Sequence, residues 1–256
     1  MSALLTAAAA TLVFCAPGYP GAAGDAQPFV DQFAKQAVSL AGWKPPTLAA
    51  IYDPTEQGGV AKLGESDSVL AFVPYAFYVQ HAADLHLAPL AQADVADVGI
   101  LERWTLVGKA GGAAGADSLS GYTILSAAGY APQFIRHSAL AAWALPADVK
   151  IEPTGQILSA LRRVAAGEKV VALLDQTQAA ALPTLPFASS LKALMQSPPL
   201  PVALVVVVDS RVPAARAKAL QAALLGMGAQ PASADTLASL HLKGFVAAQL
   251  PAPGKP

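Results

Sequence analysis

The sequence has little charge. Only 13% of its 256 residues are charged, and 16 basic residues stand against 17 acidic ones, for a net charge of -1. A disordered tail or a coiled coil would carry far more charge than this. A nucleic-acid-binding protein would need a basic excess or a basic stripe, and the sequence has neither. We therefore expect a compact globular protein that has no nucleic-acid partner.

The sequence is also poor in cysteine and in long apolar runs. Cys15 is the only cysteine, which excludes an internal disulfide framework and a cysteine-built metal site. Beyond residue 20, no window of about 18 residues is both uncharged and strongly apolar without glycine or proline. We predict no transmembrane helix there.

The first 16 residues form an apolar stretch that fits two interpretations. It has the composition of the apolar part of a signal peptide, but the first lysine is Lys35, so the positive region is missing. Lipid attachment at Cys15 is disfavoured because the bulky Phe14 precedes it. We prefer a buried strand over residues 11–17, with a signal peptide absent or truncated, because a turn and a helix follow directly.

What the sequence does contain is alternation of strands and helices. Apolar runs predict strands at 47–53, 68–79 and 97–109, and a helix with an apolar face at 26–41. The pattern then restarts with predicted strands at 122–129, 168–175 and 201–210, and predicted helices at 130–143, 155–166 and 212–227. This order predicts two α/β units that meet near Trp104.

Motifs for catalysis, metals and cofactors are absent. The sequence has no nucleophile elbow, zinc-protease motif, phosphate-binding loop or dinucleotide-binding turn. Cys15 lies in an apolar run without a basic neighbour that would lower its pKa, and His81 and His86 are badly spaced for a shared metal ion. We predict no catalytic residue, no metal and no cofactor.

Ligands of open α/β sheets gather at the carboxyl ends of strands. Five predicted turns at such ends combine small residues with aromatic or polar side chains. The candidate ligand-binding residues on these turns, together with Trp104 at the junction, are Tyr19, Tyr52, Asp53, Glu56, Tyr75, Ser126, Gly129, Tyr130, Asp175 and Gln176.

The order of these segments resembles that of the type II periplasmic solute-binding proteins, in particular the phosphate, phosphite and phosphonate subfamily that serves ABC importers. The matching segments span about residues 10–248 and include VFCAPGYPG, LAFVPYAFYVQH, ERWTLVGKAGG, DSLSGYTILSAAGYAP and PPLPVALVVVVDSRVPAARAKALQAALLGM. The resemblance implies an α/β fold with two lobes around a hinge: residues 1–103 plus 226–256 in lobe 1, and 104–225 in lobe 2. It also implies a monomer in the periplasm that takes a small-molecule ligand to an inner-membrane transporter.

One turn departs from the subfamily's pattern. In phosphonate-binding relatives the first turn of lobe 2 is rich in serine and threonine, but here Ala127 and Ala128 follow Ser126. A buried anion without such hydroxyls loses hydrogen bonds, whereas the tyrosines at the predicted cleft suit an apolar ligand with a small polar head. We therefore expect a lipid or sterol-like ligand. The alternatives are a phosphate- or phosphonate-type oxyanion, or an enzyme on the same fold.

Overall fold

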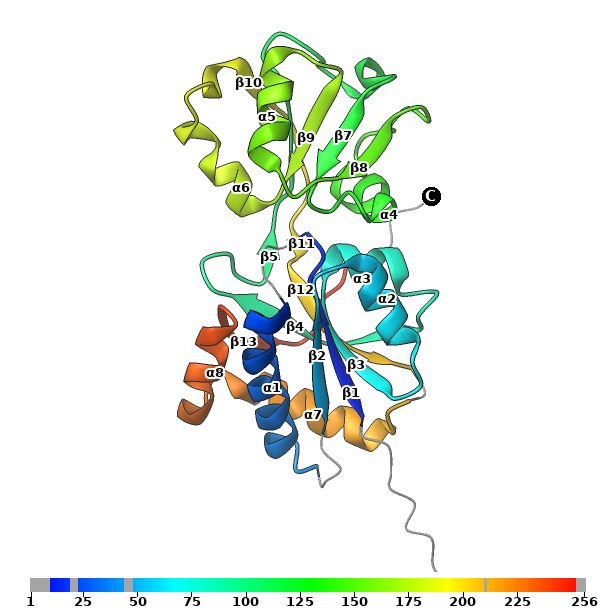
Figure 1. Ribbon diagram of the computed structural model, residues 1–256, viewed down its shortest axis with the longest axis vertical. Helices are drawn as coiled ribbons and strands as arrows, with labels where there is room; N and C mark the ends of the chain where they lie inside the picture. The colour runs from blue at the N-terminus through cyan, green and yellow to red at the C-terminus, as the bar shows by residue number, and fades with distance from the viewer. Residues whose placement is uncertain (1–9, 19–22, 44–47, 210, 252–256) are drawn as a thin grey trace, which may run out of the picture.

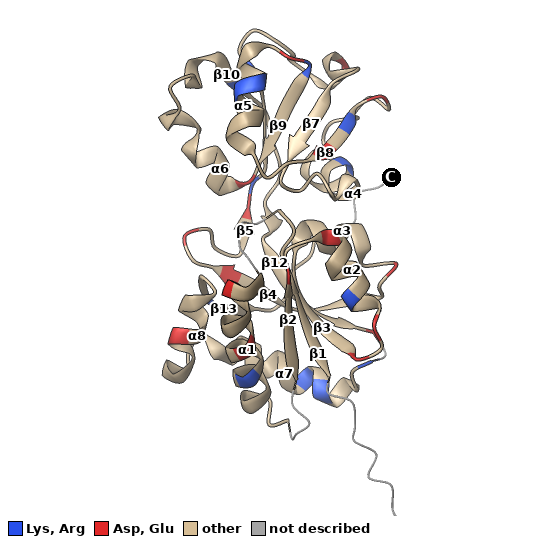
Figure 2. Ribbon diagram, viewed as in Figure 1, with Lys and Arg blue, Asp and Glu red and all other residues tan. Residues whose placement is uncertain are grey.

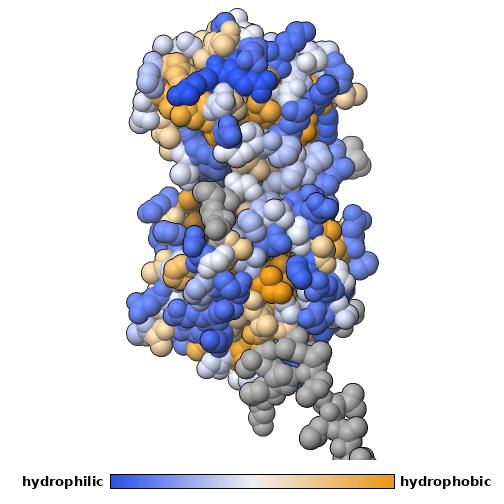
Figure 3. All heavy atoms as spheres, in the orientation of Figure 1, coloured by the Kyte–Doolittle hydropathy of each residue, from blue (hydrophilic) through white to orange (hydrophobic). Residues whose placement is uncertain are grey.

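The chain folds into two α/β lobes, one above the other in Figure 1. The computed structural model describes residues 10–18, 23–43, 48–209 and 211–251. The space-filling view in Figure 3 shows a narrowing between the two lobes. The expected two-lobed α/β architecture is confirmed.

Lobe 1 is built on a six-stranded sheet in the order β13-β4-β12-β3-β1-β2. Its strands are β1 (Thr11–Cys15), β2 (Ala49–Asp53), β3 (Ser68–Pro74), β4 (Leu87–Val95), β12 (Ala203–Val208) and β13 (Leu242–Val246). Strands β1, β2 and β3 are parallel, whereas β12 runs antiparallel to both β3 and β4. The parallel part is the portion that strand–turn–helix alternation predicts.

Helices cover both faces of this sheet. Along β1, Leu12 and Phe14 join one buried cluster and Val13 and Cys15 join another, as the two-residue period of a strand requires. The first cluster lies under α1 (Ala23–Leu40), α7 (Ala214–Met227) and α8 (Ala234–Ser239), and the second under α2 (Glu56–Gly64) and α3 (Tyr75–His81).

Lobe 2 has a five-stranded sheet in the order β10-β6-β9-β7-β8. Its strands are β6 (Thr105–Lys109), β7 (Thr123–Ser126), β8 (Lys150–Pro153), β9 (Val170–Leu174) and β10 (Leu191–Gln196). Its helices are α4 (Pro132–Phe134), which continues as a π-helical turn over Ile135–Ala139, then α5 (Ile157–Ala166) and α6 (Gln176–Ala181). Single 3-10 turns lie at Ala116–Leu119, Leu182–Thr184, Ala188–Ser190 and, in lobe 1, Pro231–Ser233.

The chain crosses between the lobes twice, and the two crossing segments pair with each other. Strand β5 (Leu101–Glu102) leads into lobe 2, and β11 (Leu200–Pro201) returns antiparallel beside it. The predicted second crossing near residue 225 is therefore wrong. Strand β12 and helix α7 lie in lobe 1, because β12 hydrogen-bonds to β3 and β4 and α7 packs on β13 and β4.

Candidate functional site

A cavity of about 260 Å³ lies between the two lobes, where the loops that follow β1, β3, β7 and β9 meet the crossing strands. Lobe 1 and the crossings contribute Pro17, Gly18, Pro74, Tyr75, Ala76, Glu102, Trp104, Pro201 and Val202. Lobe 2 contributes Ala127, Ala128, Tyr130, Phe134, Asp175, Thr177 and Gln178. The cavity is at the edge of the sheets where the sequence predicts ligand binding.

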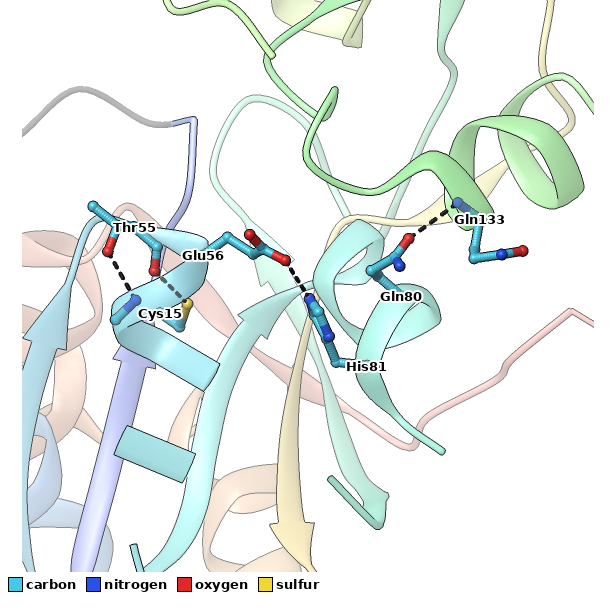
Figure 4. A network of polar contacts seen from close by, with 7 residues as sticks. Cys15, Thr55, Glu56, Gln80, His81 and Gln133 are labelled. Atoms are coloured by element: carbon cyan, nitrogen blue, oxygen red, sulfur yellow. Dashed lines mark hydrogen bonds and ion pairs between the residues drawn. The ribbon is translucent and has the colours of Figure 1, made fainter. Parts of the chain in front are cut away.

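The lobes touch directly beside this cavity. The backbone N–H of Gln133, at the start of α4, donates a hydrogen bond to the side-chain oxygen of Gln80 in α3 at 3.0 Å (Figure 4). On the other side, Gly18 approaches the backbone of Ala127 so closely that a Cβ atom on Gly18 would lie 2.5 Å from the Ala127 carbonyl oxygen. These contacts show the two lobes in a closed arrangement.

Aromatic rings form much of the cavity wall. The Phe134 ring lies edge-on to Tyr75, with ring centroids 6.1 Å apart, and edge-on to Trp104 at 5.2 Å. Tyr75 comes from lobe 1 and Phe134 from lobe 2, so this group joins the lobes through apolar contact as well as hydrogen bonding. Burial is the main cause that raises the pKa of Tyr75 above its usual value, so its hydroxyl stays neutral at physiological pH.

Two carboxyl groups line the cavity and no Lys, Arg or His does so among its described residues. Glu102 is only 6% exposed, and burial together with the charge of Asp175 raises its pKa to about 8. Hydrogen bonds from the Gln176 backbone N–H and the Trp104 side chain oppose that rise. In Figure 2 the acidic colour at β5 marks this position between the lobes.

Asp175 has a different environment. Its side chain caps α6 by accepting a hydrogen bond from the Gln178 backbone N–H at 2.8 Å. Burial raises its pKa, and the backbone N–H groups of Gln178 and Thr177 oppose the rise. The two acids therefore line the same cavity, close enough for the charge of Asp175 to act on Glu102, and backbone donors stabilise the charge on each.

The turn after β7 uses its serine internally. The buried Ser126 hydroxyl donates to the Leu173 carbonyl oxygen at 2.8 Å and accepts from the Ala128 backbone N–H. Gly129 packs against the carbonyl of Glu152, which leaves no room for a side chain. Ser126 and Gly129 therefore stabilise the turn but do not line the cavity. The residues of this turn that line it are Ala127, Ala128 and Tyr130.

The other predicted residues lie at different distances from this cavity. Tyr75, Trp104, Tyr130 and Asp175 line it, and Gln176 reaches Glu102 through its backbone. Tyr52 instead lines an apolar cavity of about 490 Å³ inside lobe 1. Tyr19 lies outside the described residues.

Two predicted acids, Asp53 and Glu56, have local partners. Asp53 accepts hydrogen bonds from the backbone N–H and hydroxyl of Thr55. Glu56 pairs with His81 Nε2 at 2.8 Å (Figure 4) and lines a neighbouring crevice, which shares Gly18 and Ala127 with the main cavity. Neither carboxyl lines the main cavity, so the structure does not bring them together with Asp175.

Cys15 has the environment of an inert thiol. It is 1% exposed, and its Sγ lies 3.5 Å from the Thr55 carbonyl oxygen. Burial raises the thiol pKa strongly, and the nearby carboxylates of Asp53 and Glu56 raise it further. The thiolate needed by a nucleophilic enzyme is thereby disfavoured.

None of the helices that the structure describes is both long and apolar enough to cross a bilayer. Within the same residues, no three His, Cys, Asp or Glu side chains gather where they could hold a metal ion.

Comparison with protein families gives one match. Residues 72–251 match the family described as the periplasmic substrate-binding protein of phosphonate ABC transporters. A comparison with curated proteins finds no match.

Several solved structures share the fold over nearly the whole chain. A Xanthomonas citri protein bound to ATP superposes with a TM-score of 0.67 at 15% identity, covering 95% of this chain and 92% of that one. A binding protein component of a phosphonate ABC transporter from Pseudomonas aeruginosa gives 0.60 at 15% identity, with 94% and 82% covered. The PhnD1 protein of Prochlorococcus marinus in complex with methylphosphonate gives 0.59 at 15% identity, with 94% and 93% covered. At such identity these likenesses establish the fold alone.

Proposed function

Because the chain belongs to the family of periplasmic substrate-binding proteins of phosphonate ABC transporters, we propose that it binds a small phosphonate- or phosphate-type oxyanion between its lobes and delivers it to a membrane transporter. The family consists of binding proteins of transporters and not of enzymes. The observation that carries the proposal is the cavity between the closed lobes, at the place where ligands of such sheets bind.

The size of the cavity favours a small ligand. Cavities for drug-sized molecules usually measure about 300–1,000 Å³, and this one, at about 260 Å³, lies below that range. A lipid or sterol would not fit in a cavity of this size. From the alanine-containing turn we expected a lipid or sterol-like ligand. Neither the size of this cavity nor the family match supports that expectation, and both favour the oxyanion alternative.

Neutral donors would have to hold the oxyanion, because the described cavity residues include no basic side chain. Thr177 and Gln178 contribute a hydroxyl and an amide, and Tyr75 and Tyr130 contribute phenolic groups. Closure of the lobes removes water from the cavity, which strengthens each of these hydrogen bonds. Closure in turn depends on the contacts that Gln80 and Gly18 make with lobe 2.

A thermal-shift screen tests this proposal. One panel holds phosphate, phosphite and methylphosphonate, and the other holds bacterial phospholipids, fatty acids and sterols. A ligand at about 100 times its Kd should raise the free energy of unfolding by about 2.7 kcal/mol, which gives a clear increase in Tm. We expect stabilisation by a member of the oxyanion panel. Stabilisation by the lipid panel alone would overturn the proposal.

A further inference from the structure

The carboxyl pair in the cavity conflicts with the charge of the proposed ligand. Glu102 and Asp175 line the same cavity of about 260 Å³, and its described residues supply no positive side chain. If both acids were charged, they would repel an entering oxyanion at short range in a poorly solvated site. A fully ionised phosphonate, which has no proton to donate, therefore binds here only when at least one of the two acids is neutral.

The environments of the two acids differ in a way that decides which one is neutral. Asp175 caps α6, where two backbone N–H groups stabilise its charge. Glu102 lies on the short crossing strand β5, is only 6% exposed and is close to the charge of Asp175. The remaining titratable groups of the cavity are the hydroxyls of Tyr75 and Tyr130. Glu102 is thus the acid that holds a proton most readily.

The hydrogen bonds of Glu102 leave its proton available. The two groups whose hydrogen bonds lower its pKa, the Gln176 backbone N–H and the Trp104 side-chain N–H, are both donors. Neither can receive the O–H of a neutral glutamic acid. An acceptor that enters the cavity can receive that O–H.

We propose that Glu102 is a specificity-determining residue that, as a neutral carboxylic acid, donates a hydrogen bond to an oxygen of the anionic ligand. The inference rests on the proposed function, because it takes the ligand to be an oxyanion. Hydrogen bonds between a neutral donor and a charged acceptor are among the stronger ones in proteins. Glu102 would then admit a phosphonate while both the ligand and Asp175 keep their charge.

This role couples ligand binding to a proton. The pKa of Glu102 in the free protein is about 8, so the acid is mostly neutral at pH 7 and mostly charged at pH 9. Above pH 8, binding must take up a proton from solvent, and affinity should fall about tenfold for each further pH unit. Below pH 7, Glu102 adds no further pH dependence.

The test measures the Kd for methylphosphonate by isothermal titration calorimetry at pH 7 and pH 9, with the wild type and with Glu102→Gln. Glutamine keeps a neutral donor but does not titrate. We expect the ratio of the Kd at pH 9 to the Kd at pH 7 to be about tenfold larger for the wild type than for Glu102→Gln. Because the ligand's own titration is common to both proteins, this comparison isolates Glu102. The exposed Glu168, paired with Arg163, provides the control Glu168→Gln, which should behave as the wild type.

A second readout counts the protons directly. Titrations of the wild type and of Glu102→Gln at pH 9 in two buffers with different heats of ionisation give the number of protons exchanged, and we expect the wild type to take up nearly one proton more than Glu102→Gln. Equal pH dependence and equal proton uptake in the two proteins would overturn the role of Glu102 alone. Tighter wild-type binding at pH 9 than at pH 7, with no such change for Glu102→Gln, would also overturn it, because it would show that the charged form of Glu102 favours binding. Absence of binding of methylphosphonate, phosphate and phosphite by every protein at both pH values would overturn the proposed function as well.

Discussion

Gln80 and Gln133 join the two lobes by a hydrogen bond, in which the Gln133 backbone N–H of lobe 2 donates to the side-chain oxygen of Gln80 in lobe 1 at 3.0 Å. The bond caps the beginning of α4, the helix that follows the turn at the cavity, so closure of the lobes and order in this turn depend on one another. A ligand that binds between the lobes gains from every contact that exists only in the closed arrangement.

Gln80→Ala removes that contact and leaves the cavity lining unchanged. A single hydrogen bond contributes about 0.5–1.5 kcal/mol, so the Kd for the ligand should rise about two- to tenfold, mainly through faster release. Stopped-flow kinetics and calorimetry measure both. Gln221→Ala is the matched control, because Gln221 bonds to the Leu90 carbonyl within lobe 1. Equal affinity losses in the two variants would contradict a role for Gln80 in closure.

Gly18→Ala should prevent full closure. Gly18 has φ of +85°, and its Cβ would lie 2.5 Å from the Ala127 carbonyl oxygen of the other lobe. Gly111→Ala is the matched control, because Gly111 has φ of +75° and no neighbour within 4 Å of the added atom. Both variants should lose roughly 1–3 kcal/mol of stability from backbone strain. Only Gly18→Ala should lose ligand affinity, by at least about tenfold; equal affinities would contradict a closed ligand-binding state.

The pH dependence of unfolding should reveal Glu102 in the ligand-free protein. Its pKa is raised from 4.5 to about 8, so in this window the folded chain holds a proton that the unfolded chain releases. The stability that it contributes is complete below pH 4.5 and is lost as pH rises through about 8, at about 1.4 kcal/mol per pH unit. Urea unfolding between pH 5 and pH 8 measures this slope.

Glu102→Gln should remove that part of the slope, and Glu168→Gln should leave it unchanged. Asp175, whose pKa is also raised, contributes a slope of the same sign in all three proteins. A wild-type slope identical to that of Glu102→Gln would show that Glu102 is charged in the folded protein at neutral pH.

Cys15 should be nearly unreactive in the folded protein. Its burial and the neighbouring carboxylates raise the thiol pKa, so very little thiolate exists at pH 8. Reaction with a chromogenic disulfide should therefore be slow in buffer and fast in concentrated urea. Rapid, stoichiometric labelling of the native chain would indicate an accessible thiolate and would favour an enzyme on this fold.

Much of the fold can be predicted from apolar periodicity, but the assignment of strands to sheets cannot. The run around Val205 predicts a strand correctly, yet nothing in its composition shows that it pairs antiparallel with β3 and β4 in lobe 1. Such pairing joins residues far apart in sequence. Strand β4 escapes prediction because Pro89 and several alanines interrupt its apolar pattern. Similarly, the apolar run 68–79 continues past Pro74, where the strand ends and α3 begins.

The site could be predicted only where a feature is local to a turn. Tyr75 and Asp175 directly follow strands, Tyr130 lies in the turn after β7 and Trp104 lies between β5 and β6, and all four line the cavity. The sequence pattern does not identify Glu102 as a site residue. It lies in the predicted strand 97–109, where a single acidic residue is expected to face solvent. Its burial arises from the pairing of β5 with β11, almost a hundred positions further along the chain. A lone acid beside Trp104, where the predicted units meet, was the available signal.

The roles of Phe134 and Gln80 also could not be predicted from the sequence. Each occupies a helix that periodicity or an apolar run marks as structural, and each gains its role from contact with the opposite lobe. Contacts between lobes depend on how the lobes are oriented, which local sequence does not encode.

The most direct experiment is a crystal structure of the protein grown with methylphosphonate at a concentration that saturates binding in solution. We expect the phosphonate group between Trp104 and the turn at Ala127, with an oxygen within hydrogen-bond distance of Glu102 and the lobes closed. Density for the ligand in the apolar cavity of lobe 1, or an empty cavity between closed lobes, would contradict this expectation.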